Sequence, residues 1–364
     1  MNKVKGISLF SGAGGLDVGF KKANVNIVWA NDINKDACET YKLNIGNHIR
    51  CGDIDVLKDE LSKYKDVNIV FGGPPCQGFS VAGKMNPDDP RSKLIWSFAD
   101  VVETVKPDIL VLENVKALGL LGKWEYVREE LLKRFRSLGY STNFFIANAC
   151  DYNTPQSRER VLIIGFKGNP EIIPNLSLMM EPYKKKGKTV KKALSILDKA
   201  GEGNNKSICN AKITLAATPI LRKSPYAGML FNGMGRPIRL NGYCATLPAS
   251  MGGNKTPIID ENELYNNAEP WIVEYQKKVM DNIENAKFEL APSFLRRITV
   301  EEAAVLQTFP LSYKFHGSQS SKYTQIGNAV PCNLGYAIAQ MVTDFLKNKI
   351  ELIPVNEQEA VLTL

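Results

Sequence analysis

The sequence predicts an α/β fold in which a mostly parallel sheet carries helices on both faces, together with a smaller, irregular and β-rich domain. Three observations support this prediction. Short apolar runs alternate with helical patterns through residues 1–168, as in successive βα units. Residues 169–293 are instead rich in Pro, Lys, Asn and Gly. Regular pattern returns over residues 294–349, and residues 350–364 form a tail.

The composition limits the class of protein. The chain has 364 residues, of which 44% are hydrophobic and 23% charged, as is ordinary for a globular protein. No segment approaches the roughly 20 apolar residues of a membrane span, and the start of the chain lacks the long apolar core of a signal peptide. We therefore expect a cytoplasmic protein that makes no membrane contact. The net charge of +8 is compatible with a polyanionic partner.

The cysteines and histidines form no pattern typical of a metal site. The seven cysteines contain no CxxC pair, and the chain has only two histidines. This spacing argues against a structural zinc site and against a disulfide framework. We predict no bound metal.

A glycine-rich turn follows the first predicted strand. The apolar run from Val4 to Phe10 leads into Gly12 and Gly14, after which a helix is expected. Glycines let the backbone approach a ligand closely, and a helix N-terminus offers N–H groups to it. The match to a dinucleotide-binding fingerprint is imperfect because Asp17 stands in place of the third glycine. Taken alone, the turn is a weak signal, and an ordinary tight turn is the alternative.

Carboxylates follow the next two predicted strands. Residues 26–30 lead to Asp32, which lies about 20 residues after the glycine turn, where an acidic residue can bind ribose hydroxyls. Residues 49–51 lead to Asp53, which is placed either to accept a hydrogen bond from an adenine amine or to cap a helix. The turn and Asp32 together predict a site for a nucleotide-type cofactor.

A stiff loop follows the apolar run of residues 67–71. The chain passes through two glycines and two prolines, residues 72–75, into Cys76. Each proline fixes its own φ and makes the preceding residue extended. We therefore expect Cys76 at the carboxyl end of a strand, where open α/β sheets bind ligands and where a thiolate can act as a nucleophile. A small buried thiol near a turn is the alternative, which the flanking prolines disfavour.

Charged side chains mark two further strand ends. The strand over residues 107–115 would deliver Glu113 to the same edge of the sheet as Cys76. Arg158 and Arg160 lie two residues apart at the start of another apolar strand, so we expect both to point to one side. A solvated pair of arginines is the alternative for these two residues when they are considered alone.

The remaining patterns are weaker. Residues 183–192 contain six lysines, which indicate either a solvated face or a contact with phosphates. Thr299 and Glu302 have the spacing of a capping box and predict a helix start. Asn328 and Ala329 precede a helix expected from about residue 333, so this turn is placed to close over a cofactor.

In their order and spacing, these stretches resemble the C5-cytosine DNA methyltransferases of restriction-modification systems. The resemblance rests on residues 10–15, 73–77, 113–115, 156–160, 297–299, 307–310 and 327–330. It implies a Rossmann-like, S-adenosylmethionine-dependent methyltransferase fold for residues 1–168, the catalytic and cofactor-binding domain, to which residues 294–349 would return. It also implies that residues 169–293 are the variable target-recognition domain, in which residues 245–247 resemble the Thr-Leu element of the family.

The resemblance assigns catalytic roles. The Cys76 thiolate would add to C6 of cytosine, and Glu113 would hold N3 and the exocyclic amine. Arg160, with Arg158 in support, would bind the O2 edge. C5 would then take the methyl group of S-adenosylmethionine, and loss of the C5 proton would expel the thiolate. The target base must first be flipped out of the duplex.

The resemblance also implies cofactor and DNA contacts. The cofactor contacts are Phe10, Gly12, Gly14, Asp32, Ile33, Asp53, Ile54, Pro75, Leu94, Asn328 and Ala329. The DNA contacts are Thr246, Leu247, Gln77 and Ser80. Many relatives carry a tryptophan after the ribose-binding carboxylate, where it stacks on adenine. Ile33 stands there in this sequence, which puts the stacking contact in doubt but not the ribose contact of Asp32.

The expected partners are double-stranded DNA, with a short palindromic target, and a cognate restriction endonuclease, and we expect the chain to act as a monomer. An RNA cytosine methyltransferase of the same superfamily is the nearest alternative, although the long middle region favours DNA. A nicotinamide-dependent oxidoreductase would account for the glycine turn and Asp32 but would leave Cys76 and Glu113 unexplained. A catalytically inactive DNA-binding protein is disfavoured because Cys76, Glu113 and Arg160 are all present.

Overall fold

The computed structural model describes residues 3–75 and 93–355, which form two compact units. The first unit comprises Met1–Asn153, Glu159–Lys186 and Val330–Leu364. The second unit comprises Thr154–Arg158 and Gly187–Ala329. None of the helices in these described ranges is both long enough and apolar enough to cross a membrane.

The first unit is built on a seven-stranded sheet with the strand order β3-β2-β1-β4-β5-β7-β6. The strands are β1 (Lys5–Leu9), β2 (Asn26–Asp32), β3 (Ile49–Cys51), β4 (Ile69–Gly72), β5 (Ile109–Val115), β6 (Tyr140–Asn148) and β7 (Glu159–Lys167). The first five strands pair in parallel, whereas β7 is antiparallel to both of its neighbours. The predicted α/β fold with a mostly parallel sheet is confirmed.

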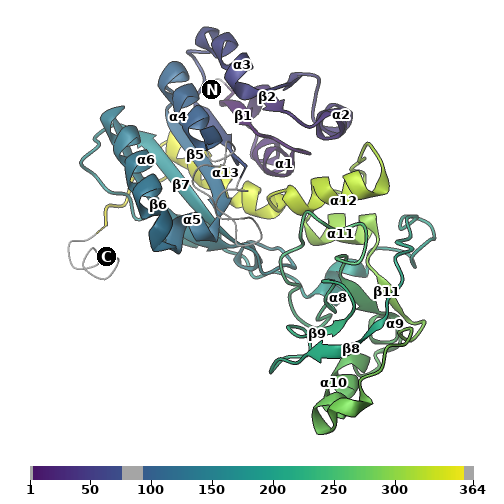
Figure 1. The fold of residues 1–364 in the computed structure, drawn as a ribbon. Coiled ribbons are helices and arrows are strands. Elements are labelled where there is room, and N and C mark those ends of the chain that lie inside the picture. The colour runs from purple at the N-terminus through teal and green to yellow at the C-terminus, as the bar shows by residue number, and fades with distance from the viewer. Residues whose placement is uncertain (1–2, 76–92, 356–364) are drawn as a thin grey trace. The chain divides into compact units, whose positions relative to one another are not determined.

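Helices cover both faces of this sheet (Figure 1). One layer contains α1 (Gly15–Lys22), α2 (Lys35–Asn44), α7 (Leu176–Met180) and α13 (Cys332–Leu346), and the other contains α3 (Ile54–Leu57), α4 (Leu94–Val105), α5 (Lys116–Leu120) and α6 (Glu125–Ser137). Successive side chains of a strand point to opposite faces. Accordingly, Ile109 and Val111 of β5 pack in the first layer, and Leu110 and Leu112 pack in the second. Both layers are required because these strands are apolar on both faces.

The helices α1 and α13 approach each other closely through two glycines. A Cβ atom on Gly19 would lie 2.3 Å from the backbone nitrogen of Tyr336 and 2.8 Å from the carbonyl oxygen of Cys332. A Cβ atom on Gly335 would lie 3.1 Å from the carbonyl oxygen of Leu16. Only side chains as small as hydrogen allow this approach, so the two glycines fix the packing of α13 onto the N-terminal part of the chain.

The second unit combines two small antiparallel sheets with short helices. The sheets pair β8 (Leu215–Ile220) with β9 (Met229–Phe231), and β10 (Ile258–Asp260) with β11 (Leu295–Arg297). The helices are α8 (Val190–Leu194), α9 (Glu261–Asn266), α10 (Trp271–Asp281), α11 (Val300–Leu306) and α12 (Gln319–Asn328). The smaller domain was expected to be irregular and β-rich, and the sequence pattern did not reveal α10.

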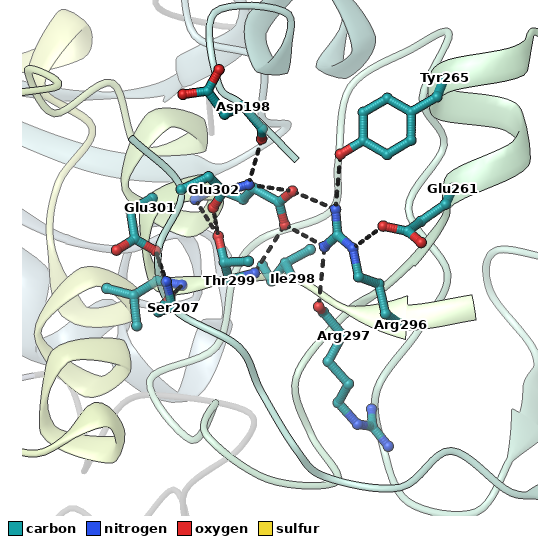
Figure 2. Close-up of polar contacts among 12 residues, drawn as sticks. Asp198, Ser207, Glu261, Tyr265, Arg296, Arg297, Ile298, Thr299, Glu301 and Glu302 are labelled. Atoms are coloured by element: carbon teal, nitrogen blue, oxygen red, sulfur yellow. Dashed lines mark hydrogen bonds and ion pairs between the residues drawn. The ribbon is translucent and has the colours of Figure 1, made fainter. Parts of the chain in front are cut away.

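A mostly buried arginine joins β11 to two helix starts in the second unit (Figure 2). Arg296 donates to the two carboxylate oxygens of Glu302 at 2.7 and 2.8 Å and to Oε1 of Glu261 at 2.7 Å. Glu302 also closes the capping box of α11 with Thr299, so the predicted capping box is confirmed. Residues 294–329 lie in the same compact unit as residues 187–293. The compact units therefore have other boundaries than the functional domains expected from sequence. Those functional domains stay a prediction.

Gly19→Ala is expected to lower the free energy of unfolding by about 1–3 kcal/mol, because the added methyl group must displace the backbone of α13. Chemical denaturation of the purified protein measures this loss. Gly122→Ala is the matched control, since no atom lies within 4 Å of a Cβ atom at that position. Equal losses in the two variants would show that the approach of α1 to α13 is not tight.

Candidate active site

The parallel strands β1, β4 and β5 deliver their following residues to one edge of the sheet. Gly72, the last residue of β4, pairs in register with Leu9 of β1 and with Leu112 of β5. Because these strands run in the same direction, Phe10 and Glu113 follow at the same level of the sheet. The glycine turn, the entrance to the Cys76 loop and Glu113 therefore share this edge.

The carboxylate of Asp32 holds the glycine turn. Its Oδ2 accepts a hydrogen bond from the Gly12 N–H at 2.7 Å, and its Oδ1 accepts one from the Asn34 N–H at 2.8 Å. Gly14 has a φ of 79°, in the left-handed region that glycine adopts without strain. Burial raises the pKa of Asp32, whereas the N–H groups of Asn34 and Gly12 act in the opposite direction. The predicted ribose-binding residue and the predicted turn thus form one hydrogen-bonded unit.

Asn31 is a bracing residue to which the sequence analysis assigned no role. Its Oδ1 accepts a hydrogen bond from the Phe10 N–H at 3.2 Å, and its Nδ2 donates to the carbonyl oxygen of Gly52 at 3.2 Å. Phe10 has a φ of 53°, which a non-glycine residue adopts only at a cost of about 1–3 kcal/mol. The side chain of Asn31 therefore helps to hold a strained residue beside the segment that leads to Asp53. Its position directly before Asp32 was the only sequence signal.

The other predicted cofactor residues of the first unit differ in their exposure to solvent and in their position relative to the helices. Asp53 is the N-cap of α3 and accepts a hydrogen bond from the N–H two residues later at 3.0 Å, so its capping role is confirmed and its contact with adenine stays a prediction. Ile54 is buried, and Leu94 is half-buried at the start of α4. Ile33 is 70% exposed, so an apolar side chain directly beside Asp32 is open to a flat ligand.

Glu113 and Arg160 form a largely buried ion pair. Arg160 Nε lies 2.8 Å from Glu113 Oε1, and the two side chains are 12% and 11% exposed. Arg160 pairs in register with Val115, which is two residues beyond Glu113 on the same face of β5. The antiparallel direction of β7 therefore brings the guanidinium diagonally across to the carboxylate. The structure unites two residues that the sequence analysis predicted to act on the same base.

Gly73 and Asn114 fit the described segment before Cys76 against Glu113. A Cβ atom on Gly73 would lie only 2.7 Å from Glu113 Oε2, so this glycine makes room for the carboxylate. The side chain of Asn114, which is 2% exposed, donates to the carbonyl oxygen of Pro74 at 3.1 Å. The path of the chain is thus fixed beside Glu113 as far as Pro75. The predicted nucleophile Cys76 and the predicted DNA contacts Gln77 and Ser80 lie outside the described residues.

Arg158 has different surroundings from Arg160. It is 3% exposed in the second unit, where it donates to the carbonyl oxygens of Leu247 at 3.3 Å and Gly327 at 3.0 Å. The two arginines have different partners, because β7 begins at Glu159 and the two-residue alternation of a strand does not reach Arg158. The expectation that both point to one side stays a prediction. The described contacts of Arg158 brace the backbone, and its support of Arg160 in catalysis stays a prediction.

The predicted Thr-Leu element is held by consecutive residues of the 156–160 stretch. Gln156 Oε1 accepts a hydrogen bond from the Leu247 N–H at 3.2 Å, and the Thr246 hydroxyl donates to the Ser157 carbonyl oxygen at 3.2 Å. Leu247 is buried, whereas Thr246 is exposed. The element therefore presents Thr246 to solvent from a fixed backbone.

Gln307 extends this arrangement to the end of α12. Gln156 Nε2 donates to Gln307 Oε1 at 3.1 Å, and Gln307 Nε2 donates to the carbonyl oxygens of Ile326 at 2.7 Å and Ala329 at 3.1 Å. Both glutamines are fully buried, whereas Asn328 at the end of α12 is exposed. The glutamines occur in stretches that the resemblance singled out, yet their bracing roles were missed because nothing in local spacing reveals a contact across some 150 residues.

Comparisons with known proteins agree with this arrangement. Two relatives cover nearly the whole chain. This chain is 32% identical over 356 residues to Type II methyltransferase M1.HphI of Haemophilus parahaemolyticus, and the match covers 94% of this chain and 87% of the relative. It is 31% identical over 353 residues to Type II methyltransferase M.FnuDI of Fusobacterium nucleatum, with 95% and 96% covered.

Two solved structures share the fold. The S. pombe Dnmt2 methyltransferase has a TM-score of 0.66 at 20% identity, with 94% of this chain and 99% of that chain covered. The Entamoeba histolytica methyltransferase EhMeth has a TM-score of 0.67 at 18% identity, with 95% and 99% covered. A family model described as C-5 cytosine-specific DNA methylase matches residues 4–344. Because the model spans both units, the chain belongs to the C-5 cytosine-specific DNA methylase family and is a DNA cytosine-5-methyltransferase.

Proposed function

We propose that the enzyme transfers a methyl group from S-adenosylmethionine to C5 of cytosine in one short sequence of double-stranded DNA, through a covalent adduct on Cys76. The observation that carries the proposal is the buried Glu113–Arg160 pair at the edge of the sheet, beside the entrance to the Cys76 loop. The Asp32-bound glycine turn follows β1 at the same edge. Groups suited to the base and to the methyl donor are therefore neighbours within the first unit.

The residues at the glycine turn fit S-adenosylmethionine. Apart from its chain neighbours, no atom of the described residues lies within 4 Å of a Cβ atom built on Gly12, which would leave room for a ligand at this part of the turn. The Asp32 carboxylate suits ribose hydroxyls, and the exposed Ile33 suits the face of an adenine. The bound cofactor would supply an electrophilic methyl group. The remaining contacts proposed by resemblance are those of Phe10, Gly14, Asp53, Ile54, Pro75, Leu94, Asn328 and Ala329.

Cytosine C5 is a poor nucleophile, and the residues assigned to the site would activate it for methyl transfer. The Cys76 thiolate forms a bond to C6 and pushes the electron pair of the C5–C6 double bond toward C5. Glu113 holds N3 and the exocyclic amine and stabilises protonation at N3 as the thiolate adds. Arg160 orients Glu113 by its hydrogen bond and binds the O2 edge. After methylation, loss of the C5 proton restores the double bond, breaks the bond to sulfur and releases 5-methylcytosine.

The target base must leave the duplex before this reaction, at a cost of a few kcal/mol. We assign DNA contacts to Thr246 and Leu247, to Gln77 and Ser80 of the Cys76 loop, and to phosphate-binding lysines of residues 184–192. The relatives named above are type II methyltransferases. By that likeness, the enzyme would protect host DNA from a cognate restriction endonuclease. The cytoplasmic location and the monomeric state stay predictions from the sequence.

Cys76→Ala is expected to abolish methyl transfer to duplex DNA because no nucleophile remains to activate C5. The dissociation constant for S-adenosylmethionine should be unchanged. Transfer of labelled methyl groups and titration calorimetry measure the two quantities. Turnover by the variant would contradict the nucleophile. Transfer by the wild type to tRNA in preference to duplex DNA would contradict the substrate.

Glu113→Gln is expected to lower kcat by about 10²–10³-fold, because the amide cannot stabilise the positive charge that develops on the base. DNA affinity should change far less. The matched control is Glu159→Gln, which removes an exposed carboxylate paired with Lys116 at 2.9 Å and should leave kcat nearly unchanged. Equal losses of kcat and DNA affinity in Glu113→Gln would refute the role given to this residue.

Gln156→Ala is expected to weaken DNA binding by about tenfold, since it removes the acceptor that holds the Leu247 N–H and leaves buried polar groups unpaired. The affinity for S-adenosylmethionine should stay the same. Fluorescence anisotropy with labelled duplex measures the first effect, and calorimetry measures the second. Gln319→Ala, which removes an exposed glutamine of the same unit, is the control. Unchanged DNA affinity in Gln156→Ala would show that the Thr-Leu element does not depend on this bracing.

A further inference from the structure

A carboxyl group without a role in the mechanism lies directly behind the glycine turn. Asp17 occupies the first turn of α1 and is fully buried, at the position where a dinucleotide-binding fingerprint has glycine. Acidic side chains are almost never fully buried without a compensating interaction. The position of Asp17 beside a cofactor turn therefore calls for a functional explanation.

The contacts of Asp17 satisfy only part of its carboxyl group. Oδ1 accepts a hydrogen bond from the Tyr41 hydroxyl at 2.9 Å, and that hydroxyl also lies 3.1 Å from Nε2 of His48. Oδ2 has no hydrogen bond of good geometry among the described residues. The neighbouring Ser8 hydroxyl lies 2.8 Å from the hydroxyl of Ser11, which belongs to the glycine turn. Asp17 is thus connected through side chains both to α2 and to the turn itself.

The environment of Asp17 sets its ionisation near neutral pH. Burial raises the pKa of Asp17 to about 7, although the hydroxyls of Ser8 and Tyr41 favour its charged form. The negative charge of Asp32 on β2 raises that pKa further. His48 contacts the Tyr41 hydroxyl that donates to Asp17, and the Cys332 thiol of α13 is close enough for the charge of Asp17 to act on its pKa. Asp17 is therefore neutral in mildly acidic solution and negative in mildly alkaline solution.

The methyl donor and its product differ in charge at one atom. S-adenosylmethionine carries a positive sulfonium, whereas the product, S-adenosylhomocysteine, has a neutral thioether in its place. A fixed negative charge next to the binding turn interacts with the sulfonium and has no such interaction with the thioether. Asp17 and Asp32 lie on opposite sides of the turn in sequence and both contribute negative charge there.

We propose that Asp17 is a specificity-determining residue of the cofactor site, whose buried carboxylate makes the site favour the cationic methyl donor over the neutral-sulfur product. The proposal rests on the proposed use of S-adenosylmethionine. It gives the enzyme a means of releasing its product, because the interaction that helps to bind the donor disappears once the methyl group has left. The same interaction makes this preference depend on pH.

Titration calorimetry with each ligand tests the proposal by binding alone. At about pH 8.5, Asp17→Asn should lower the preference for S-adenosylmethionine over S-adenosylhomocysteine by about fivefold, the effect expected of one unit charge in a partly shielded site. The amide is nearly isosteric and still accepts from Tyr41, so the fold should be retained. Asp59→Asn, which removes an exposed carboxylate of the same unit, should leave the preference unchanged.

A pH series separates this role from a structural one. At about pH 5.5 the wild type should lose its extra preference and resemble Asp17→Asn, because Asp17 is then protonated. Tyr41→Phe should move this loss to higher pH, because the charged form loses a hydrogen-bond donor. Equal weakening of both ligands in Asp17→Asn, or an unchanged preference, would overturn the proposal for Asp17. Failure of the wild type to bind either ligand would overturn the proposed cofactor as well.

Discussion

Glu113 carries a carboxylate at a position from which water is largely excluded, and the active centre depends on the arginine that pairs with it. A buried charge that loses its partner costs about 3–5 kcal/mol, so neither member of the Glu113–Arg160 pair is expendable. The pair exists because β7 runs antiparallel to β5, which sets Arg160 opposite Val115. Gly73 leaves room for the carboxylate, and Asn114 ties the entrance of the Cys76 loop beside it. The reversal of a single strand in an otherwise parallel sheet thus brings together Glu113 and Arg160, the groups that we propose bind the base.

The second unit follows the same physical rule, with the buried polar groups near Leu247 held by hydrogen bonds. Gln156, Arg158 and Gln307 are buried and direct their hydrogen bonds to one another or to backbone groups. A buried polar group is tolerated when it is hydrogen-bonded, and such a network then specifies one arrangement of the backbone. This explains how polar residues in family-specific stretches can serve architecture as well as chemistry. Arg160 forms an ion pair with Glu113, the proposed base-binding carboxylate, whereas Arg158, two residues earlier, supports the backbone around Leu247.

The features that sequence predicted are those that depend on local pattern. The apolar strands, the turn after β1 and the Thr299–Glu302 capping box each follow from residues within a few positions of one another. The direction of β7 could not be predicted, because an apolar strand buried on both faces carries no mark of its neighbours. The helix α12 was hidden because few of its residues are apolar, and α10 lay in a region whose composition favoured loops.

Contacts between residues far apart in the sequence limited how much of the candidate site could be predicted. Asn31 joins Phe10 to Gly52, and Gln156 joins Leu247 to Gln307, across separations that no spacing rule covers. The resemblance to a family identified the stretches that contain Phe10, Gln156 and Gln307. It did not cover Asn31 or Gly52. It did not separate the side chains that contact ligands from those that support the backbone. That separation requires hydrogen-bond partners and burial, which only a three-dimensional structure supplies.

The most direct test of this account is base-resolution methylation sequencing of plasmid DNA from cells that express the chain, with Cys76→Ser expressed to the same level as control. The account predicts 5-methylcytosine at one position of one short sequence and its absence from the control. Methylation that persists with Cys76→Ser would contradict the covalent mechanism. Unmethylated DNA from cells that contain folded wild-type protein would contradict the proposed activity on DNA.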